Sequence, residues 1–316
     1  TKAIAVGHDL GHAPFGHGGE RIINELAKIH GLDSFWHERN SLHLIDEIET
    51  LEDNEHHRHN LNLTYAIRDG IISHCGEMNQ KAIIKRNESI DLKDYLYPGQ
   101  YNPYTWEGCV VKMSDKIAYL ARDIEDALRL NIIDEQLVED LRNLNQLTKS
   151  HFDAINNGTI VNYFILDVCQ NSSIEKGICL SDEAFEVMKY IMKFNYQNIY
   201  LIDRIEVHTN YVQLILNSIF QFLYKYDKIA NDNQINVLEA LKKDQKKYPV
   251  TIQGYMHWLE KYSQMKHFNR NPLYQNHIIY DFEHDKNAMA KSIIDYLSGM
   301  SDAYILKIFN EFISFS

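Results

Sequence analysis

The sequence predicts an all-α fold. Apolar residues recur at the 3.6-residue spacing of amphipathic helices along most of the 316 residues, and convincing alternation of period two is scarce. Only 14 Gly and 5 Pro occur, too few for the many turns of a sandwich or a barrel. Hydrophobic residues make up 45% and charged residues 24%, the composition of a folded protein with a substantial core.

Helical periodicity is readable in ten segments in chain order. They span about residues 19–29, 41–50, 62–74, 105–130, 134–148, 182–194, 203–224, 235–243, 251–265 and 285–316. Residues 160–168 and 277–282 are the two segments predicted as extended. Chain breakers support this division: Pro98, Gly99 and Pro103 precede the long helix that starts at Thr105.

The domain division predicted from this pattern is a core over residues 1–150 and a helical C-terminal region over residues 151–316. Because helix follows helix on both sides of residue 150, one continuous helical body is an equally open alternative.

The charge balance indicates how a substrate can be bound. Lys and Arg total 32 against 44 acidic residues, a formal charge of −12. This argues against a non-specific nucleic-acid coat protein, so nucleic acid is not an indicated partner. An anionic substrate must therefore be met by local cations or by a metal ion.

The cysteines and the apolar runs bear on location. The four cysteines form no C-x-x-C pair, which predicts a reducing, cytoplasmic environment. The longest uncharged stretch, residues 209–224, is too short and too polar to span a bilayer, so no membrane partner is expected.

Residues 7–20 carry the first candidate site. Five of the 14 glycines fall in the first 19 residues, among three histidines, an aspartate and a glutamate. An imidazole next to a carboxylate, His8 and Asp9, suits Mn, Fe, Co or Ni, with Mg less natural. Turn glycines and Pro14 are expected to return His12 and His17 towards the same space. The dipeptide His284-Asp285 lacks these companions and is predicted to be a solvated helix start.

A second segment, residues 112–130, is expected to add an oxygen ligand from a helix. Its apolar residues fall on one face: Met113, Ile117, Leu120, Ile124 and Leu128. Its polar residues fall on the opposite face: Asp115, Tyr119, Arg122 and Asp126, with Asp123 beside them. Periodicity alone leaves open whether this polar face is a binding site or simply solvated.

With these two segments, the chain resembles the HD-domain phosphohydrolases, and more narrowly the deoxynucleoside triphosphate triphosphohydrolases, or dGTPase-like proteins. The family block H-D-x-G-x-x-P-F-G-H-x-G-E matches His8 to Glu20 without a gap, and D-x-I-A-Y-x-x-x-D-x-E-D-A matches Asp115 to Ala127. Weaker matches follow in the expected order at residues 35–38, 63–74 and 295–302.

The resemblance implies an HD-domain helical bundle extended by a C-terminal helical region. It implies a divalent metal ion (Mn, Mg, Co, Fe or Ni) held by three ligands: His8, Asp9 and Asp115. It implies that His17 and Glu20 position or activate water and that His37 assists proton transfer.

The resemblance also implies a substrate, a dNTP cut between the α-phosphorus and the 5′-oxygen to give a deoxynucleoside and tripolyphosphate. His12 and Lys116 are then expected to face the triphosphate, with Tyr119 and Asp123 beside the deoxyribose. A homo-oligomer is expected, and an allosteric nucleotide is a further candidate partner.

One departure from the family pattern concerns its remaining metal ligand. That ligand is a His on a helix upstream of the His-Asp pair, accompanied by an Arg that contacts phosphate. Only Thr1 to Gly7 precede His8 here, and none of these residues is His or Arg. Since the chain starts without Met, we expect it to begin inside a longer gene product; a truncated chain with an incomplete metal site is the alternative.

Three other features have an alternative to a role in catalysis or binding. The run Glu55 to His59 has no acidic or Cys partner at ligand spacing in this interpretation, so an exposed loop is predicted. Trp36 and Trp106 are expected to pack in a core or interface. The rival functions are an HD phosphohydrolase with another nucleotide or phosphoester as substrate, and a non-catalytic nucleotide sensor.

Overall fold

The predicted all-α class is confirmed by the computed structural model, which describes residues 1–75, 80–141 and 156–314. The α-helices of these residues are α1 (Lys2–Gly7), α2 (Gly16–Ile29), α3 (His37–His43), α4 (Tyr65–Ile72), α5 (Trp106–Arg129), α6 (Glu135–Asp140), α8 (Asn157–Asn171), α9 (Asp182–Asn195), α10 (Asp203–Asn233), α11 (Val237–Lys242), α12 (Pro249–Tyr262), α13 (Ala288–Ser298) and α14 (Asp302–Ile313). Short π or 3-10 turns are η1 (Leu44–Ile48), η2 (Leu92–Asp94) and η4 (Tyr196–Tyr200).

The strands of the described residues form three two-stranded pairs. β1 (Thr50–Glu52) pairs antiparallel with β2 (Arg58–Asn60), and β3 (Ala82–Ile83) pairs antiparallel with β4 (Ile178–Cys179). β5 (Ser263–Gln264) pairs in parallel with β6 (Tyr280–Asp281), so the extended structure predicted at 277–282 is confirmed in part.

The prediction that residues 160–168 are extended is wrong, because they lie inside α8. Asn156 caps this helix: its side chain accepts the N–H of Thr159, and the Thr159 side chain bonds back to the backbone of Asn156. The buried residues Ile160 and Phe164 are one helical turn apart. A strong cap and a buried face therefore override the β preference of the branched residues here.

Two further differences concern helix ends. The single helix predicted over 285–316 is two helices, because the chain breaks at Gly299 to Ser301 and Ser301 caps α14 by accepting the N–H of Tyr304. The short helix α1 is absent from the predicted set.

The end of the helix predicted over 134–148 and the boundary near residue 150 lie outside the described residues, so the predicted domain division stays a prediction.

The chain divides into two compact units, which we describe separately. Unit 1 comprises Thr1–His8 and Thr64–Val207, and unit 2 comprises Asp9–Leu63 and His208–Ser316. One division thus falls inside the His8-Asp9 dipeptide, and another falls within α10.

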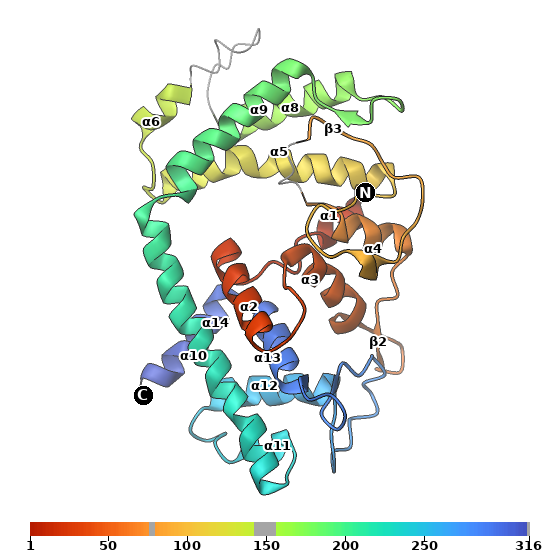
Figure 1. The fold of residues 1–316 in the computed structure, drawn as a ribbon, viewed down its shortest axis with the longest axis vertical. Helices are drawn as coiled ribbons and strands as arrows, with labels where there is room; N and C mark the ends of the chain where they lie inside the picture. Colours follow the sequence, from red (N-terminus) through yellow and green to blue (C-terminus); the bar gives the residue numbers. More distant parts are fainter. Residues whose placement is uncertain (76–79, 142–155, 315–316) are drawn as a thin grey trace. The chain divides into compact units, whose positions relative to one another are not determined.

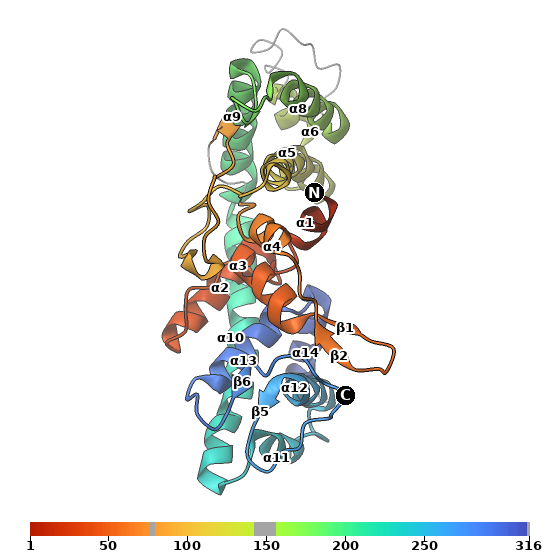
Figure 2. The same ribbon diagram turned by 90° about the vertical axis from the view of Figure 1, so that its right-hand side faces the viewer.

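Unit 1 is built around α5. Helices α8 and α9 pack on it, as both views show, and α4 and α1 pack against its N-terminal half (Figures 1 and 2). The predicted apolar face of α5 is confirmed, since Met113, Ile117, Leu120 and Ile124 are buried in the core of this unit. A Cβ at Gly108 would meet Pro103 at 2.6 Å and lie 3.5 Å from the Cα of Gly70, so glycines let α4 approach α5 closely.

Unit 2 contains the larger core, formed by α2, α10, α12 and α13 with their neighbours. Ile22 and Ile23 of α2 and Ile293 and Leu297 of α13 are among its buried residues, and α2 packs directly on α13. The hairpin of β1 and β2 belongs to this unit. None of the helices among the described residues combines the length and apolar character needed to cross a membrane.

Candidate functional site

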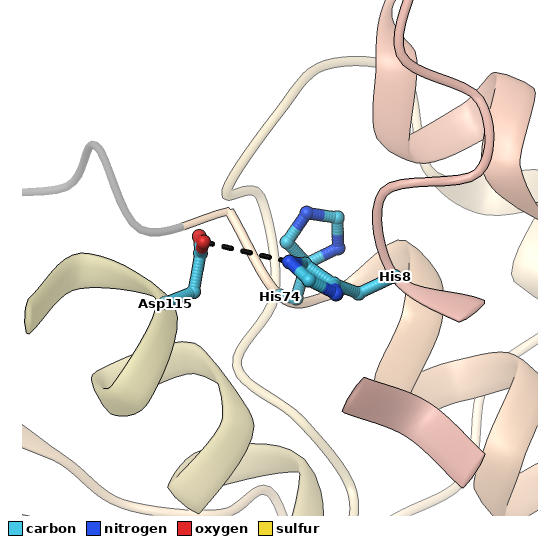
Figure 3. Close-up of side chains that lie close together, drawn as sticks. All are labelled: His8, His74 and Asp115. Atoms are coloured by element: carbon cyan, nitrogen blue, oxygen red, sulfur yellow. Dashed lines mark ion pairs between the residues drawn. The ribbon is translucent and has the colours of Figure 1, made fainter. Parts of the chain in front are cut away.

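His8, His74 and Asp115 converge in unit 1 from three helices. His8 caps the C-terminus of α1, His74 follows the end of α4, and Asp115 lies in the first half of α5 (Figure 3). The Nε2 atom of His8 lies 3.5 Å from Oδ1 of Asp115, and the two imidazole rings meet edge to face at a centroid distance of 4.8 Å. One ligand atom from each side chain lies within 4.8 Å of the other two.

The two imidazoles are held in the same way. Nδ1 of His8 bonds to the carbonyl of Ala5 at 2.8 Å, and Nδ1 of His74 bonds to the carbonyl of Ile71. A carbonyl accepts only, so each Nδ1 carries a proton, and in the neutral ring this leaves the lone pair on Nε2. Metal-binding histidines are oriented by this type of second hydrogen bond.

The donor set fits a divalent metal ion. Two neutral imidazoles and a carboxylate suit Mn, Fe, Co, Ni or Zn. Ligand atoms bound to one such ion lie about 3.3 Å apart in a tetrahedral site, close to the His8–Asp115 distance. His74 is buried, whereas His8 and Asp115 are 23% and 27% exposed, so the group is reached from one side.

His74 is the residue that sequence reasoning missed. It entered the sequence interpretation only as the end of a weak motif match, because no local spacing connects it to His8 or Asp115. Asp9, the third predicted ligand, belongs to unit 2, where Oδ1 lies 3.3 Å from Nδ1 of His12.

A second cluster lies in unit 2 around Glu20 of α2. Nδ1 of His37 lies 3.0 Å from Oε2 of Glu20, and the backbone N–H of His37 donates to Oε1 at 3.2 Å. Nδ1 of His17 lies 3.4 Å from the same Oε2. The rings of His12, His17 and His37 lie 5.2 to 5.9 Å apart between centroids. The structure therefore brings together all three residues predicted as catalytic.

The motif glycines permit this arrangement. A Cβ at Gly11 would lie 2.0 Å from the backbone nitrogen of Ser41 and 2.6 Å from the carbonyl oxygen of His37, so only glycine lets this loop touch α3. Gly11 also accepts from the Asn40 side chain and donates to Oγ of Ser41. A Cβ at Gly19 would lie 1.8 Å from the carbonyl oxygen of Pro14.

Hydrogen bonding within this cluster shifts both partners towards their charged forms. Burial raises the pKa of Glu20, but the bonds from His17 and His37 outweigh burial and lower this pKa to about 2. Burial lowers the pKa of His37, but the bond from Glu20 and the charges of Glu38 and Glu20 outweigh it and raise this pKa to about 9. Glu20 and His37 thus form an ion pair at neutral pH.

The predicted substrate-binding residues of α5 lie one to two turns apart in unit 1. Lys116 is buried, and its Nζ donates to the carbonyl of Gln80 at 3.4 Å; burial, with the neighbouring Lys112, lowers its pKa to about 8. Tyr119 is partly buried, and Asp123 accepts a hydrogen bond from the hydroxyl of Tyr200. His12, the fourth predicted residue, is in the unit 2 cluster.

The remaining sequence interpretations can also be compared with the structure. Trp36 is buried and Trp106 packs against the unit 1 core, as predicted. His284 is exposed and bonds to Asp281, so the solvated position predicted for it agrees with the structure; it lies in a turn, and α13 begins only at Ala288, so the predicted helix start is wrong. The run Glu55 to His59 agrees with the predicted exposed loop only in part: Glu55 and His56 are exposed in the turn, whereas Arg58 and His59 belong to β2 and are half-buried. An acidic partner, Asp53, also lies beside the run.

Several curated proteins similar to this chain carry the name deoxyguanosinetriphosphate triphosphohydrolase-like protein. The protein from Clostridium tetani is 28% identical over 313 residues, which cover 98% of this chain and 67% of that protein. The protein from Desulfatibacillum aliphaticivorans is 34% identical over 227 residues, 70% of this chain and 56% of that protein. The protein from Caldanaerobacter subterraneus is 30% identical over 234 residues, 73% of this chain and 57% of that protein.

Over most of its length the chain is similar to deoxyguanosinetriphosphate triphosphohydrolase-like proteins, in agreement with the resemblance seen in its motifs. No protein-family model matches it. The chain spans little more than half the length of two of these relatives and 67% of the third. Similarity to triphosphohydrolase-like proteins implies a divalent metal ion, and unit 1 contains a His/Asp cluster that could hold one.

Proposed function

We propose that this chain hydrolyses deoxynucleoside triphosphates in a metal-dependent reaction that yields deoxynucleoside and tripolyphosphate. The observation that carries the proposal is the convergence of His8, His74 and Asp115, residues far apart in sequence, in a chain whose curated relatives are named triphosphohydrolase-like.

In unit 1, His8, His74 and Asp115 would hold the metal ion through their Nε2 and carboxylate oxygen atoms. When bound, this ion neutralises phosphate charge and polarises a phosphoryl oxygen. The prediction from sequence that Asp9 is a ligand stays a prediction. Lys116, the residue after Asp115, carries the ammonium that we propose binds the chain of phosphates, because a compact positive charge suits a flexible polyanion. Its Nζ is buried against the carbonyl of Gln80, so phosphate binding would exchange that contact for the substrate.

The sugar end of the substrate is assigned to the same helix. Tyr119 and Asp123 follow Lys116 at helical spacing, and both remain at least partly exposed. We propose that Tyr119 packs against the deoxyribose and that Asp123, held by the Tyr200 hydroxyl, accepts from the 3′-hydroxyl. A ribose 2′-hydroxyl would then compete for the space that Tyr119 fills.

In unit 2, Glu20, His17 and His37 supply acid–base groups. Glu20 is held by two bonds from His37, one from its ring and one from its backbone, so its orientation is set before substrate arrives. His17 is the exposed member, with 68% of its side chain accessible, and it is the one that we propose exchanges protons with water or the leaving group. His12 is the remaining imidazole of this group, proposed as a phosphate contact.

The test is product analysis with dATP, dCTP, dGTP, dTTP and GTP, each with Mn²⁺, Mg²⁺ and Co²⁺ in separate reactions. We expect tripolyphosphate and deoxynucleoside in equal amounts, a dependence on added metal, and little turnover of GTP. Phosphorus NMR identifies tripolyphosphate directly.

Two outcomes would contradict the proposal. Release of orthophosphate from a phosphomonoester, while dNTPs stay intact, would indicate an HD phosphohydrolase with a different substrate. An increase in thermal stability with dNTP but without turnover, in metal-loaded protein, would point to a nucleotide sensor.

A further inference from the structure

A hairpin in unit 2 presents a second group of metal-binding side chains. β1 and β2 pair with Thr50 opposite Asn60 and Glu52 opposite Arg58. The turn between them is closed by backbone bonds from Asp53 N–H to the carbonyl of His57 and from His56 N–H to the carbonyl of Asp53. His56 has a positive φ of 67°, which lets the turn reverse tightly.

Three side chains meet on one face of this hairpin. Oδ2 of Asp53 lies 3.4 Å from Nδ1 of His57 and 3.0 Å from Nε2 of His59. The ligand atoms of all three residues lie within 4.8 Å of one another. His57 and His59 share this face because they are two residues apart in a strand segment.

The carboxylate is oriented towards the two imidazoles. Oδ1 of Asp53 accepts the backbone N–H groups of Glu55 at 2.8 Å and of His57 at 2.9 Å. The backbone of the turn thus fixes Oδ1, and Oδ2 faces the ring nitrogens of His57 and His59. The imidazoles and the carboxylate therefore need little rearrangement to bind one ion.

The hairpin is anchored on its outer edge as well. The backbone N–H of Arg58 donates to the carbonyl of Leu273 at 2.8 Å, and the N–H of Gln275 donates to the carbonyl of Arg58 at 3.0 Å. The Asn60 side chain donates to the carbonyl of Glu47. Ligands on a backbone held from both sides bind a metal ion more tightly than ligands on a free loop.

We propose that Asp53, His57 and His59 form a binding site for a first-row divalent metal ion with imidazole preference, zinc being the ion whose geometry fits best. Ligand atoms on a tetrahedral zinc ion lie about 3.3 Å apart, between the two observed distances from Asp53. The three side chains are 25% to 45% exposed, so the ion is reached from solvent and its fourth position is open to water or an external ligand. This site is separate from the His8 cluster and goes beyond the proposed hydrolysis.

One neighbouring carboxylate, Glu55, lies beside the group, with Oε2 3.6 Å from Nδ1 of His57, whereas Glu52 is engaged in other pairs. Glu52 bonds to Arg58 at 2.9 Å and to His56 at 2.5 Å. His56 is 78% exposed and belongs to that pair rather than to the metal group. It therefore serves as a matched control in the same turn.

The experiment measures zinc binding to the whole chain. Metal-free protein is titrated with zinc sulfate by calorimetry and its zinc content is counted after gel filtration, in the wild type and in an Asp115→Asn background that disables the His8 cluster. We expect the background protein to retain one zinc ion per chain. Adding Asp53→Asn, His57→Gln or His59→Gln should weaken that binding at least about tenfold. Cobalt(II) at this site should give the visible absorption of a tetrahedral ion.

The controls are His56→Gln, in the same turn, and His284→Gln, whose imidazole pairs with Asp281. Both should retain zinc. Unchanged affinity in His59→Gln, an equal loss in His284→Gln, or no zinc in the Asp115→Asn background would each overturn the proposal. Circular dichroism and melting of the metal-free variants separate loss of ligand from loss of fold; three independent single variants guard against one that fails to fold.

Discussion

His37 bonds to Glu20 twice, through Nδ1 at 3.0 Å and through its backbone N–H at 3.2 Å. The first residue starts α3 and the second lies in the first turns of α2. The pair therefore links α2, which carries the end of the His8 to Glu20 motif, to α3. Both side chains are about 15% exposed, so this is a largely buried ion pair and not a surface one.

The pair predicts a pH window of stability. The pKa of His37 is raised from 6.5 to about 9, so its contribution is complete below pH 6.5 and is lost as pH rises through 9. The pKa of Glu20 is lowered from 4.5 to about 2, so its contribution is complete above pH 4.5 and is lost as pH falls through 2. We therefore expect the pair to contribute fully to the free energy of unfolding between about pH 4.5 and 6.5, which urea unfolding from pH 3 to 10 can measure.

Glu20→Gln tests that window. It should lower the free energy of unfolding by about 1–3 kcal/mol near pH 6, because it leaves a buried imidazolium without its charge partner, and by less at pH 10. His284→Gln, at an exposed pair, is the control and should change it little. An equal loss at pH 6 and pH 10 would contradict the ion pair.

Metal-ligand substitutions should separate the unit 1 cluster from other histidines. His8→Ala, His74→Ala and Asp115→Ala should each reduce metal-dependent turnover by more than about 100-fold, since each removes a direct ligand. His284→Ala should stay near wild type. Activity assays with metal titration decide this; equal losses in all four variants would contradict the assignment, and full activity in His74→Ala would remove His74 from the site.

Glu20→Gln also tests the proposed acid–base role. It should reduce kcat by about 100-fold or more while changing nucleotide affinity much less, because Glu20 orients His17 and His37, whose proton transfers act in the transition state rather than in binding. Single-turnover kinetics and nucleotide titration separate the two effects. Unchanged turnover would remove Glu20 from the mechanism.

Gly11→Ala tests the close approach of the motif loop to α3. A Cβ there lies 2.0 Å from the Ser41 nitrogen, so backbone must move, and we expect a loss of at least about 2 kcal/mol in the free energy of unfolding. Gly158→Ala is the matched control: its Cβ meets only the Asn156 side chain at 3.4 Å within α8, where alanine favours the helix. Urea unfolding measures both, and a neutral Gly11→Ala would contradict the close contact.

Much of the fold was predictable because its signals are local. The apolar face of α5 and the grouping of His17 with Glu20 depend on helical spacing, which the sequence displays. One failure is also local: residues 160–168 are predicted as extended, but a capping box and a buried face make them helical in α8.

The sequence by itself determined the helical class, the His8 to Glu20 motif and the polar face that carries Asp115. Tertiary structure alone decided that His74 joins His8 and Asp115. The reason is physical: spacing within an element follows from backbone geometry, whereas convergence between elements depends on how closely they pack. In unit 1 that closeness rests on glycines such as Gly70 and Gly108, whose partners lie far away in the chain.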